Sequence, residues 1–146
     1  MSHIEIKLGD DFDLHSELVS PIWVEIDGEA FPDTDWDDFS HTLLGWWSNA
    51  LLSYTDSSVG FRLDFMDGPY EIIVSRKGDA WALSCMREDR CLLSGECSFQ
   101  DLVNALYDAL KKLHFLLHEN ASPERTTAWM EEELRLRTDR LRKLIQ

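Results

Sequence analysis

Cysteine, basic side chains and long apolar runs are all scarce in this chain of 146 residues. Its three cysteines, Cys85, Cys91 and Cys97, form no Cys-x-x-Cys pair, which argues against a zinc site or a redox disulfide. We expect buried, reduced thiols, because an odd count without an apolar leader segment is typical of a reducing compartment. The longest unbroken apolar run is residues 80–83, whereas a membrane helix needs about 20 apolar residues. The sequence therefore predicts a cytoplasmic protein with no membrane partner.

Basic residues are the second shortage. The chain has 14 Lys and Arg against 28 Asp and Glu, which gives a formal net charge of −14. Residues 1–60 hold thirteen of the acids and one base, Lys7, for a net charge of −12. Nucleic acids are bound mainly through Lys and Arg on phosphate, so we expect no nucleic-acid partner. A surface this negative attracts a cationic protein, and the alternative is that the acidity serves only solubility.

Recognisable catalytic motifs are also lacking. The chain contains no Gly-x-Ser-x-Gly, no glycine-rich phosphate loop and no dinucleotide-binding fingerprint. Asp33, Asp35 and Asp37 have the spacing of a calcium loop, but Asp38 and Leu44 occupy the positions that need Gly and Glu. We therefore predict no metal, no cofactor and no catalytic residue, and interpret these acids as part of a helix start.

One histidine pair keeps an enzyme open as an alternative. His114 and His118 are four residues apart, which is a zinc-ligand spacing on a helix, but the Glu that metalloproteases place between them is absent. Together with Tyr107 on the same predicted helix, they could form an Asp/His acid–base site. We favour the simpler interpretation, a histidine pair at the boundary of an apolar helix face.

Apolar periodicity predicts an α+β fold in a single domain over residues 1–146. The predicted strands are 3–8, 21–27, 61–65, 70–74, 80–86 and 91–96. The predicted helices are 34–54, 98–120 and a third that begins at Ser122-Pro123-Glu124. The order β-β-α-β-β-β-β-α-α and the short turns favour one antiparallel sheet of about six strands, with the helices packed mainly on one face.

The first predicted helix begins in an acidic segment. Asp33 or Thr34 suits the N-cap position, and the acids that follow suit the positive end of the helix dipole. Its apolar residues, Trp46 among them, fall within one arc that we expect to face the sheet. His41 and Ser48 lie on the opposite side, which we expect to face solvent.

A few apolar residues lie outside the predicted core faces and indicate a second contact surface. They are Leu52, Phe115, Trp129 and Leu136. For Phe115 this surface could simply be the third helix. Trp129 and Leu136 fit either an intramolecular sandwich or a subunit interface, and the latter would give a homodimer through the C-terminal helix.

A pattern of apolar and turn residues covers residues 22–83. It comprises WDDF at 36–39, LLGWW at 43–47, FMDGPY at 65–70 and Trp81. This pattern resembles small bacterial proteins of the polymorphic-toxin immunity type. The resemblance implies a non-catalytic, protein-binding role, and it assigns no active-site residue.

A binding role agrees with the distribution of charge. An inhibitor of a basic toxin covers a cationic cleft, and exposed carboxylates give fast, salt-sensitive association. The candidate partner-binding residues are Asp10, Asp11, Asp13, Asp33, Asp35, Asp37 and Asp38. One alternative is an acidic export chaperone that binds an apolar segment, an association that salt would weaken far less. The other alternative is the small enzyme with an Asp/His site.

Overall fold

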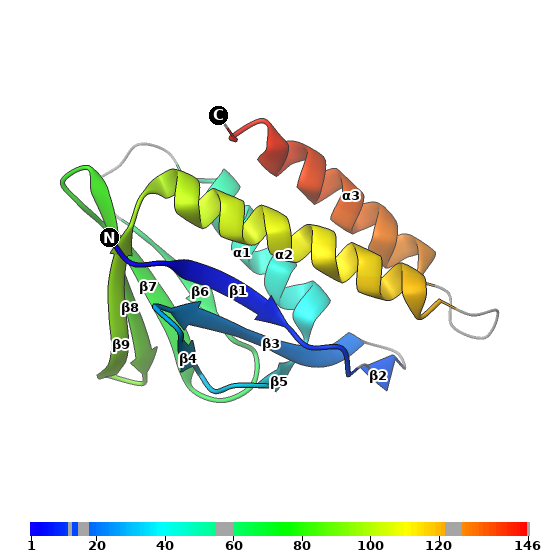
Figure 1. Cartoon of the computed structure of the whole chain (residues 1–146), viewed down its shortest axis with the longest axis horizontal. Coiled ribbons are helices and arrows are strands. Elements are labelled where there is room, and N and C mark those ends of the chain that lie inside the picture. The colour runs from blue at the N-terminus through cyan, green and yellow to red at the C-terminus, as the bar shows by residue number, and fades with distance from the viewer. Residues whose placement is uncertain (12, 15–17, 55–59, 122–126, 146) are drawn as a thin grey trace.

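The computed structural model describes residues 1–11, 13–14, 18–54, 60–121 and 127–145 (Figure 1). The helices in these ranges are α1 (Ser40–Leu52), α2 (Phe99–Glu119) and α3 (Ala128–Arg142). The strands are β1 (Ile4–Leu8), β2 (Asp13–Leu14), β3 (Leu18–Ile26), β4 (Glu29–Phe31), β5 (Asp37–Asp38), β6 (Phe61–Asp64), β7 (Tyr70–Lys77), β8 (Ala80–Arg87) and β9 (Arg90–Cys97). These elements confirm the α+β class. None of the helices in the described ranges has the length and apolar character needed to cross a membrane.

The strands form two antiparallel sheets, so the expectation of one sheet of about six strands is wrong. In the first sheet, β1, β2, β4 and β5 all pair with β3. The second sheet is the meander β6-β7-β8-β9, which confirms the four consecutive strands expected from the alternating segments. Within the first sheet, β1 and β4 lie on opposite sides of β3 at Val24–Ile26, and none of the described strands of this sheet pairs with the meander.

The two sheets meet where the start of the chain passes β9. Ser2 donates its backbone N–H to the Glu96 carbonyl oxygen at 2.7 Å. Gly95 has no room for a side chain, because a Cβ there would lie 2.6 Å from Ile26 Cγ2 and 2.8 Å from Ser2 Oγ. Glycine at this position therefore allows β9 to approach the first sheet closely.

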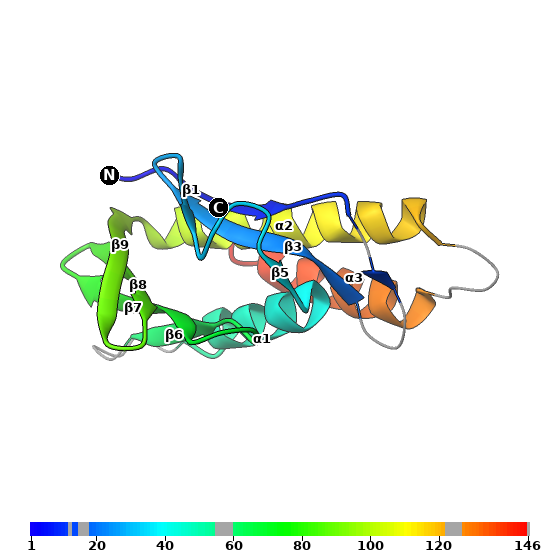
Figure 2. The same ribbon diagram turned by 90° about the horizontal axis from the view of Figure 1, so that it is seen from below.

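The helices pack beside the sheets and against one another. Helix α2 runs along β1, and α1 contacts β3, β6 and both other helices (Figure 2). Helix α3 packs mainly against α1 and α2, on the far side of α2 from β1 in Figure 1. Because α3 covers the side of α1 that was expected to face solvent, His41 and Ser48 are buried. Trp46, expected to point inward, is instead 43 % exposed.

Helix α1 begins at Ser40 rather than at residue 34. Residues 37–38 form β5, where Asp37 pairs with Pro21 and Asp38 pairs with Ser20. The acids before α1 are therefore not in its first turn, which contains no acidic residue. The helix prediction fails here because acids near a helix start report only a favourable local dipole, whereas β3 engages this backbone through tertiary pairing.

Helix α2 agrees with its prediction at both ends. Ser98 Oγ accepts a hydrogen bond from the Asp101 N–H at 3.0 Å, and the helix ends before Asn120. Helix α3 begins at Ala128, and its predicted start at Ser122-Pro123-Glu124 lies outside the described residues.

A chain of aromatic rings connects the two sheets and α1. The edge-to-face pairs and their centroid distances are Trp36–Tyr70 at 5.1 Å, Tyr70–Phe31 at 5.7 Å, Phe31–Phe65 at 5.7 Å and Phe65–Trp47 at 5.2 Å. Trp47 also donates its Nε1–H to the Asp64 carbonyl oxygen at 2.8 Å. Pairs of this geometry contribute about 0.5–1.5 kcal/mol each beyond the area they bury, so the chain helps to hold the sheets in place.

Candidate functional site

The predicted partner-binding acids are mostly exposed. The exposed ones are Asp10, Asp11, Asp33, Asp35 and Asp37. Two of these follow β1, two lie between β4 and β5, and the last belongs to β5. Asp13 lies in β2, and its side chain is outside the described part of the chain. We call the five exposed residues the loop acids.

Asp38 is the exception, because its side chain is only 2 % exposed. Its carboxylate accepts hydrogen bonds from the Phe39 N–H at 2.7 Å, the Asp67 N–H at 3.0 Å and the Trp36 Nε1–H at 3.2 Å. The expectation that Asp38 is one of the exposed acids is therefore wrong. Its carboxylate instead ties the segment before α1 to the turn between β6 and β7.

The structure brings the two groups of loop acids to neighbouring positions around β3. Gly9, directly before Asp10, donates its N–H to the Pro21 carbonyl oxygen at 3.0 Å. On the other side of β3, Pro21 pairs with Asp37. The end of β1 and the strand β5 are therefore two strand spacings apart, or roughly 10 Å.

The loop acids have no basic side chain paired with them in the described part of the chain. None of them forms an ion pair with another described residue. Lys7, which is the one base among residues 1–60, is held 2.7 Å from Glu5 Oε2. Solvated carboxylates in this state repel one another, and an approaching cationic surface relieves that repulsion.

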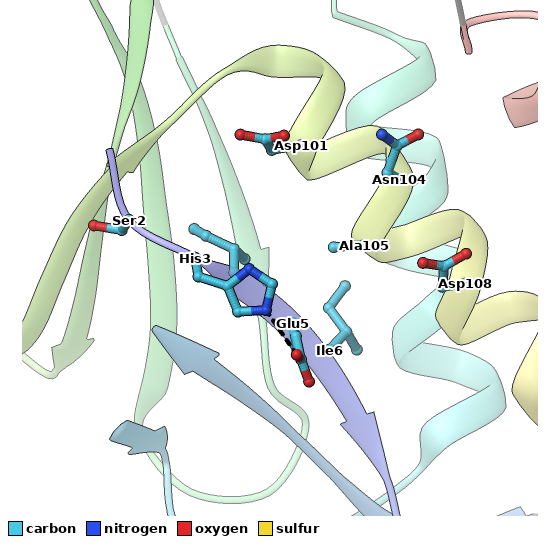
Figure 3. A pocket seen from close by; sticks show the side chains of 9 residues that line it. Ser2, His3, Glu5, Ile6, Asp101, Asn104, Ala105 and Asp108 are labelled. Carbon is cyan, nitrogen blue, oxygen red and sulfur yellow. Dashed lines mark hydrogen bonds and ion pairs between the residues drawn. The ribbon is translucent and has the colours of Figure 1, made fainter. Parts of the chain in front are cut away.

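A second acidic surface lies between β1 and the first half of α2 (Figure 3). It is a groove of about 340 Å³, lined by residues 2–6 on one side and by Asp101, Asn104, Ala105 and Asp108 on the other. The spacing of residues 101, 104 and 108 places them on one stripe of the helix. Asp101 and Asp108 are exposed, and neither forms an ion pair within the described part of the chain. We call this feature the β1–α2 groove.

Glu5 also lines the β1–α2 groove, but its carboxylate projects from β1 away from α2 (Figure 3). Its Oε2 lies 2.7 Å from Lys7 Nζ. Its Oε1 lies 2.7 Å from His3 Nε2, a contact drawn in Figure 3. Hydrogen bonds from Lys7 and then from His3 hold the pKa of Glu5 below its ordinary value, so this carboxylate is ionised at neutral pH and is paired with Lys7. At the far end of β1, Lys112 Nζ donates to the Leu8 carbonyl oxygen at 3.0 Å.

Sequence reasoning did not select Glu5, Asp101 or Asp108. A signal for the helical pair was present, because Asp101 and Asp108 follow the helical period beside the apolar stripe of α2. No such signal linked them to β1, which is about a hundred positions earlier in the chain. The groove is therefore a product of tertiary packing.

The histidine pair lies at the junction of α2 and α3. Glu131 Oε1 is 3.5 Å from His114 Nε2 and 3.1 Å from His118 Nδ1. Burial alone would raise the pKa of Glu131, but hydrogen bonds from Thr127 and His118 outweigh it and lower that pKa. Tyr107 contacts Arg142 instead, whose Nε donates to its hydroxyl at 3.3 Å. No group of three or more His, Cys, Asp or Glu within the described ranges is arranged to hold a metal ion.

Three of the four apolar residues expected at a second contact surface are exposed. The exposed fractions are 63 % for Phe115, 54 % for Trp129 and 45 % for Leu136. Leu52 is half-buried against the core, so its assignment to that surface is wrong. Phe115 lines a groove of about 500 Å³ between α2 and α3, and Trp129 packs edge-to-face on His41 at 5.3 Å.

The cysteines divide into two environments. Cys85 and Cys97 are buried, and burial raises their pKa values to about 12 and about 11. Thiols in that state are poor nucleophiles. Cys91 is exposed, so the expectation of three buried thiols is wrong for this residue, which lies on the last strand of the meander. All three are free of disulfides.

Comparison with known proteins assigns no family to the chain. No family model matches it, and neither the curated proteins nor the solved structures give a match. The likeness of residues 22–83 to immunity-type proteins therefore stays a prediction, and function must be argued from the surfaces described above.

Proposed function

We propose that this chain is a non-catalytic acidic protein that binds a cationic protein, in the manner of an immunity-type inhibitor of a basic bacterial toxin. The observation that carries the proposal is the placement of carboxylates that have no ion-pair partner among the described residues. Two of the loop acids directly follow β1, the others lie across β3 from its end, and the β1–α2 groove runs along it. A basic partner that approaches β1 therefore meets negative charge from both sides.

Such a surface favours binding at two stages. At long range, uncompensated charge steers a cationic partner and raises its association rate, within a screening length of about 8–10 Å at physiological salt. At contact, the carboxylates pair with Lys and Arg that would otherwise hold phosphate. Because the loop acids have no described ion-pair partner, no internal pair has to break first.

The cytoplasm is the compartment we propose for this binding. Cys85 and Cys97 are buried as free thiols, and Cys91 is an exposed free thiol. Three unpaired cysteines fit a reducing environment, in which disulfides do not persist.

The exposed apolar residues of α2 and α3 favour a second candidate function, an acidic export chaperone. Phe115, Trp129 and Leu136 lie outside the core and offer contact area to an apolar segment of a partner, or to a second copy through α3. Binding of this kind relies on buried apolar area, so added salt should leave it nearly unchanged.

Salt dependence separates the two candidates. The test is titration calorimetry with the purified protein encoded next to this chain in its genome, at low and at high NaCl concentration. Charge-led binding predicts a dissociation constant that rises at least about tenfold at high salt. A constant that does not change with salt, together with loss of binding on Phe115→Ser, would support the chaperone instead.

Charge-matched variants locate the surface at low salt. The test variant combines Asp33→Asn, Asp35→Asn and Asp37→Asn. The control removes as many exposed acids elsewhere and combines Asp79→Asn, Asp89→Asn and Glu119→Gln. We expect the test variant to weaken binding about tenfold and the control less than about threefold. Equal effects would show that only net charge matters and would remove the assignment to the loop acids.

A further inference from the structure

Strand β1 presents an unpaired edge to the β1–α2 groove. In an antiparallel pair, the residues that exchange hydrogen bonds alternate along the strand. The His3 carbonyl oxygen accepts from the Asp27 N–H at 2.8 Å, and the Gly9 N–H donates to the Pro21 carbonyl oxygen at 3.0 Å. The backbone N–H and C=O groups of odd-numbered residues of β1 therefore point toward β3. Those of even-numbered residues point away from it.

The two ends of this edge are occupied and its middle is open. At one end, the Ser2 N–H donates to the Glu96 carbonyl oxygen at 2.7 Å. At the other end, the Leu8 carbonyl oxygen accepts from Lys112 Nζ at 3.0 Å. Between them, the N–H and C=O groups of Ile4 and Ile6 have no hydrogen-bond partner beyond β3 among the described residues. An open edge of this kind is a template for another strand.

The space beside the open edge belongs to the β1–α2 groove. Residues 2–6 form one wall of this groove, and Asp101, Asn104 and Asp108 line the other along α2 (Figure 3). Asp101 and Asp108 are two helical turns apart, or about 10.5 Å. Alternate side chains of an extended segment are about 6.7 Å apart, and long Lys or Arg side chains reach across the difference.

Charge decides which occupant fits this edge. On the other face of β1, a paired strand would place a side chain directly opposite Glu5. A second copy of this chain, paired β1 to β1, would bring Glu5, Asp101 and Asp108 of both copies together, and opposed like charges are destabilising. A segment with Lys or Arg on the side that faces α2 is complementary to Asp101 and Asp108, whereas Glu5 on the other face is already paired with Lys7.

We propose that β1 accepts an extended, basic segment of the partner protein as an additional strand. The segment exchanges backbone hydrogen bonds with Ile4 and Ile6 and directs Lys or Arg side chains toward Asp101 and Asp108. This is recognition by strand addition, in which the backbone supplies affinity and the side chains supply specificity. It rests on the proposed function and specifies how the cationic partner is held.

A synthetic peptide probes the strand edge while the protein stays intact. The probe is a blocked heptapeptide in which lysine alternates with valine, titrated into the 15N-labelled chain. We expect the Ile4 and Ile6 amide protons to exchange with solvent at least about tenfold more slowly in the complex, since they become hydrogen-bonded. Binding without slower exchange at these two amides would overturn strand addition.

Methylation of the peptide backbone supplies a matched control. An N-methyl group on the residues whose N–H faces β1 removes their donors, whereas methylation of the alternate residues leaves the paired side intact. Both peptides keep the same charge. We expect methylation of the residues whose N–H faces β1 to weaken binding at least about tenfold. Methylation of the alternate residues should change binding less than about threefold. Equal affinities of the two sets would show that only charge is recognised.

Substitutions on α2 then test the side-chain contacts. The pair Asp101→Asn and Asp108→Asn is compared with Asp89→Asn and Glu119→Gln, two exposed acids outside the groove and outside the loop acids, which removes the same charge. We expect the groove pair to weaken the peptide about tenfold and the control pair less than about threefold. A peptide that binds in a salt-sensitive manner without this difference contradicts the strand site but leaves the acidic binding function standing. A partner whose binding is insensitive to salt contradicts the proposed function itself.

Discussion

Adjacent carboxylates in β5 have opposite environments because side chains alternate across a strand. Asp37 pairs with Pro21 and is exposed, whereas Asp38 pairs with Ser20 and both of these side chains are buried. The charge of Asp38 is compensated by three N–H donors rather than by a base. A shift of one position along the chain therefore separates an exposed acid from a buried, hydrogen-bonded one.

Substitution of Asp38 tests this division. Asp38→Ala removes the acceptor of three hydrogen bonds in a buried place, and we expect it to lower the free energy of unfolding by about 2–4 kcal/mol. The neighbouring Asp37→Ala is the control and should change stability by less than about 0.5 kcal/mol. Urea denaturation measures both. Similar losses for the two variants would mean that the hydrogen bonds contribute little.

His41 is a second ionisable side chain that is buried. Its Nε2 lies 3.3 Å from Glu133 Oε2, but the geometry is not that of a hydrogen bond, and Nε2 has no such partner among the described residues. Burial is the main reason why the pKa of His41 lies below its ordinary value, and Arg137 adds to this effect while Glu133 opposes it. The folded chain therefore holds this imidazole neutral at neutral pH.

The pH dependence of stability follows from that lowered pKa. The unfolded chain binds a proton at His41 near pH 6.5, whereas the folded chain resists protonation until lower pH. We expect the free energy of unfolding to decrease as the pH falls through about 6.5. His41→Gln should reduce this decrease, and the exposed His118→Gln should leave it in place. Urea titrations at a series of pH values measure the slopes, and identical slopes for both variants would contradict the assignment.

Helices α1 and α2 differ in how far local sequence determines them. Both ends of α2 follow from the serine cap and the apolar stripe, which act within the helix itself. The start of α1 does not follow, because residues 37–38 pair with β3 and this competing partner is distant in the sequence. The same reason explains why the prediction of a single sheet is wrong. Alternation of apolar and polar residues identifies the strands, but it does not specify which strands pair with one another.

The cap of α2 offers a quantitative test at the scale of the element. Ser98→Ala removes the acceptor of the Asp101 N–H, and we expect a loss of about 1 kcal/mol in the free energy of unfolding. Ser98→Asp retains a cap acceptor and should keep most of the stability. Thermal and urea unfolding measure the stability of the unsubstituted protein and of the two variants. A stable Ser98→Ala protein would show that tertiary packing alone fixes this helix end.

The candidate site was predictable only in part for a similar reason. The exposure of Asp10, Asp11, Asp33, Asp35 and Asp37 follows from their place in polar turns, and it agrees with expectation. The β1–α2 groove requires the packing of two elements from opposite parts of the chain, which no local pattern specifies.

At the scale of the whole molecule, one close contact in the junction of the two sheets requires a glycine. Gly95 lies beside Ile26 of β3 and Ser2 at the chain start, and a Cβ would approach Ile26 Cγ2 to 2.6 Å. A larger residue requires the side chains of Ile26 and Ser2 to shift or β9 to move away from the first sheet. This contact adds to those of Phe31 with Phe65 and Tyr70, which join the same two sheets.

Gly95→Val tests the importance of that contact. We expect a loss of about 1–3 kcal/mol in the free energy of unfolding, since overpacked sites force backbone shifts. Gly78→Asn is the control, because Gly78 has a φ of 63°, which Asn tolerates, and open space around its Cβ position. Chemical denaturation of both variants provides the comparison. Unchanged stability of Gly95→Val would show that the sheets separate at no cost.

The aromatic chain from Trp36 to Trp47 has an optical consequence. Its rings are held at interplanar angles between 71° and 82° by groups from both sheets and from α1. Fixed aromatic side chains give a near-ultraviolet circular dichroism spectrum that disappears when tertiary packing loosens while helices and strands persist. Ellipticity in that wavelength range therefore reports directly whether the two sheets remain docked, even in a variant whose secondary structure is intact.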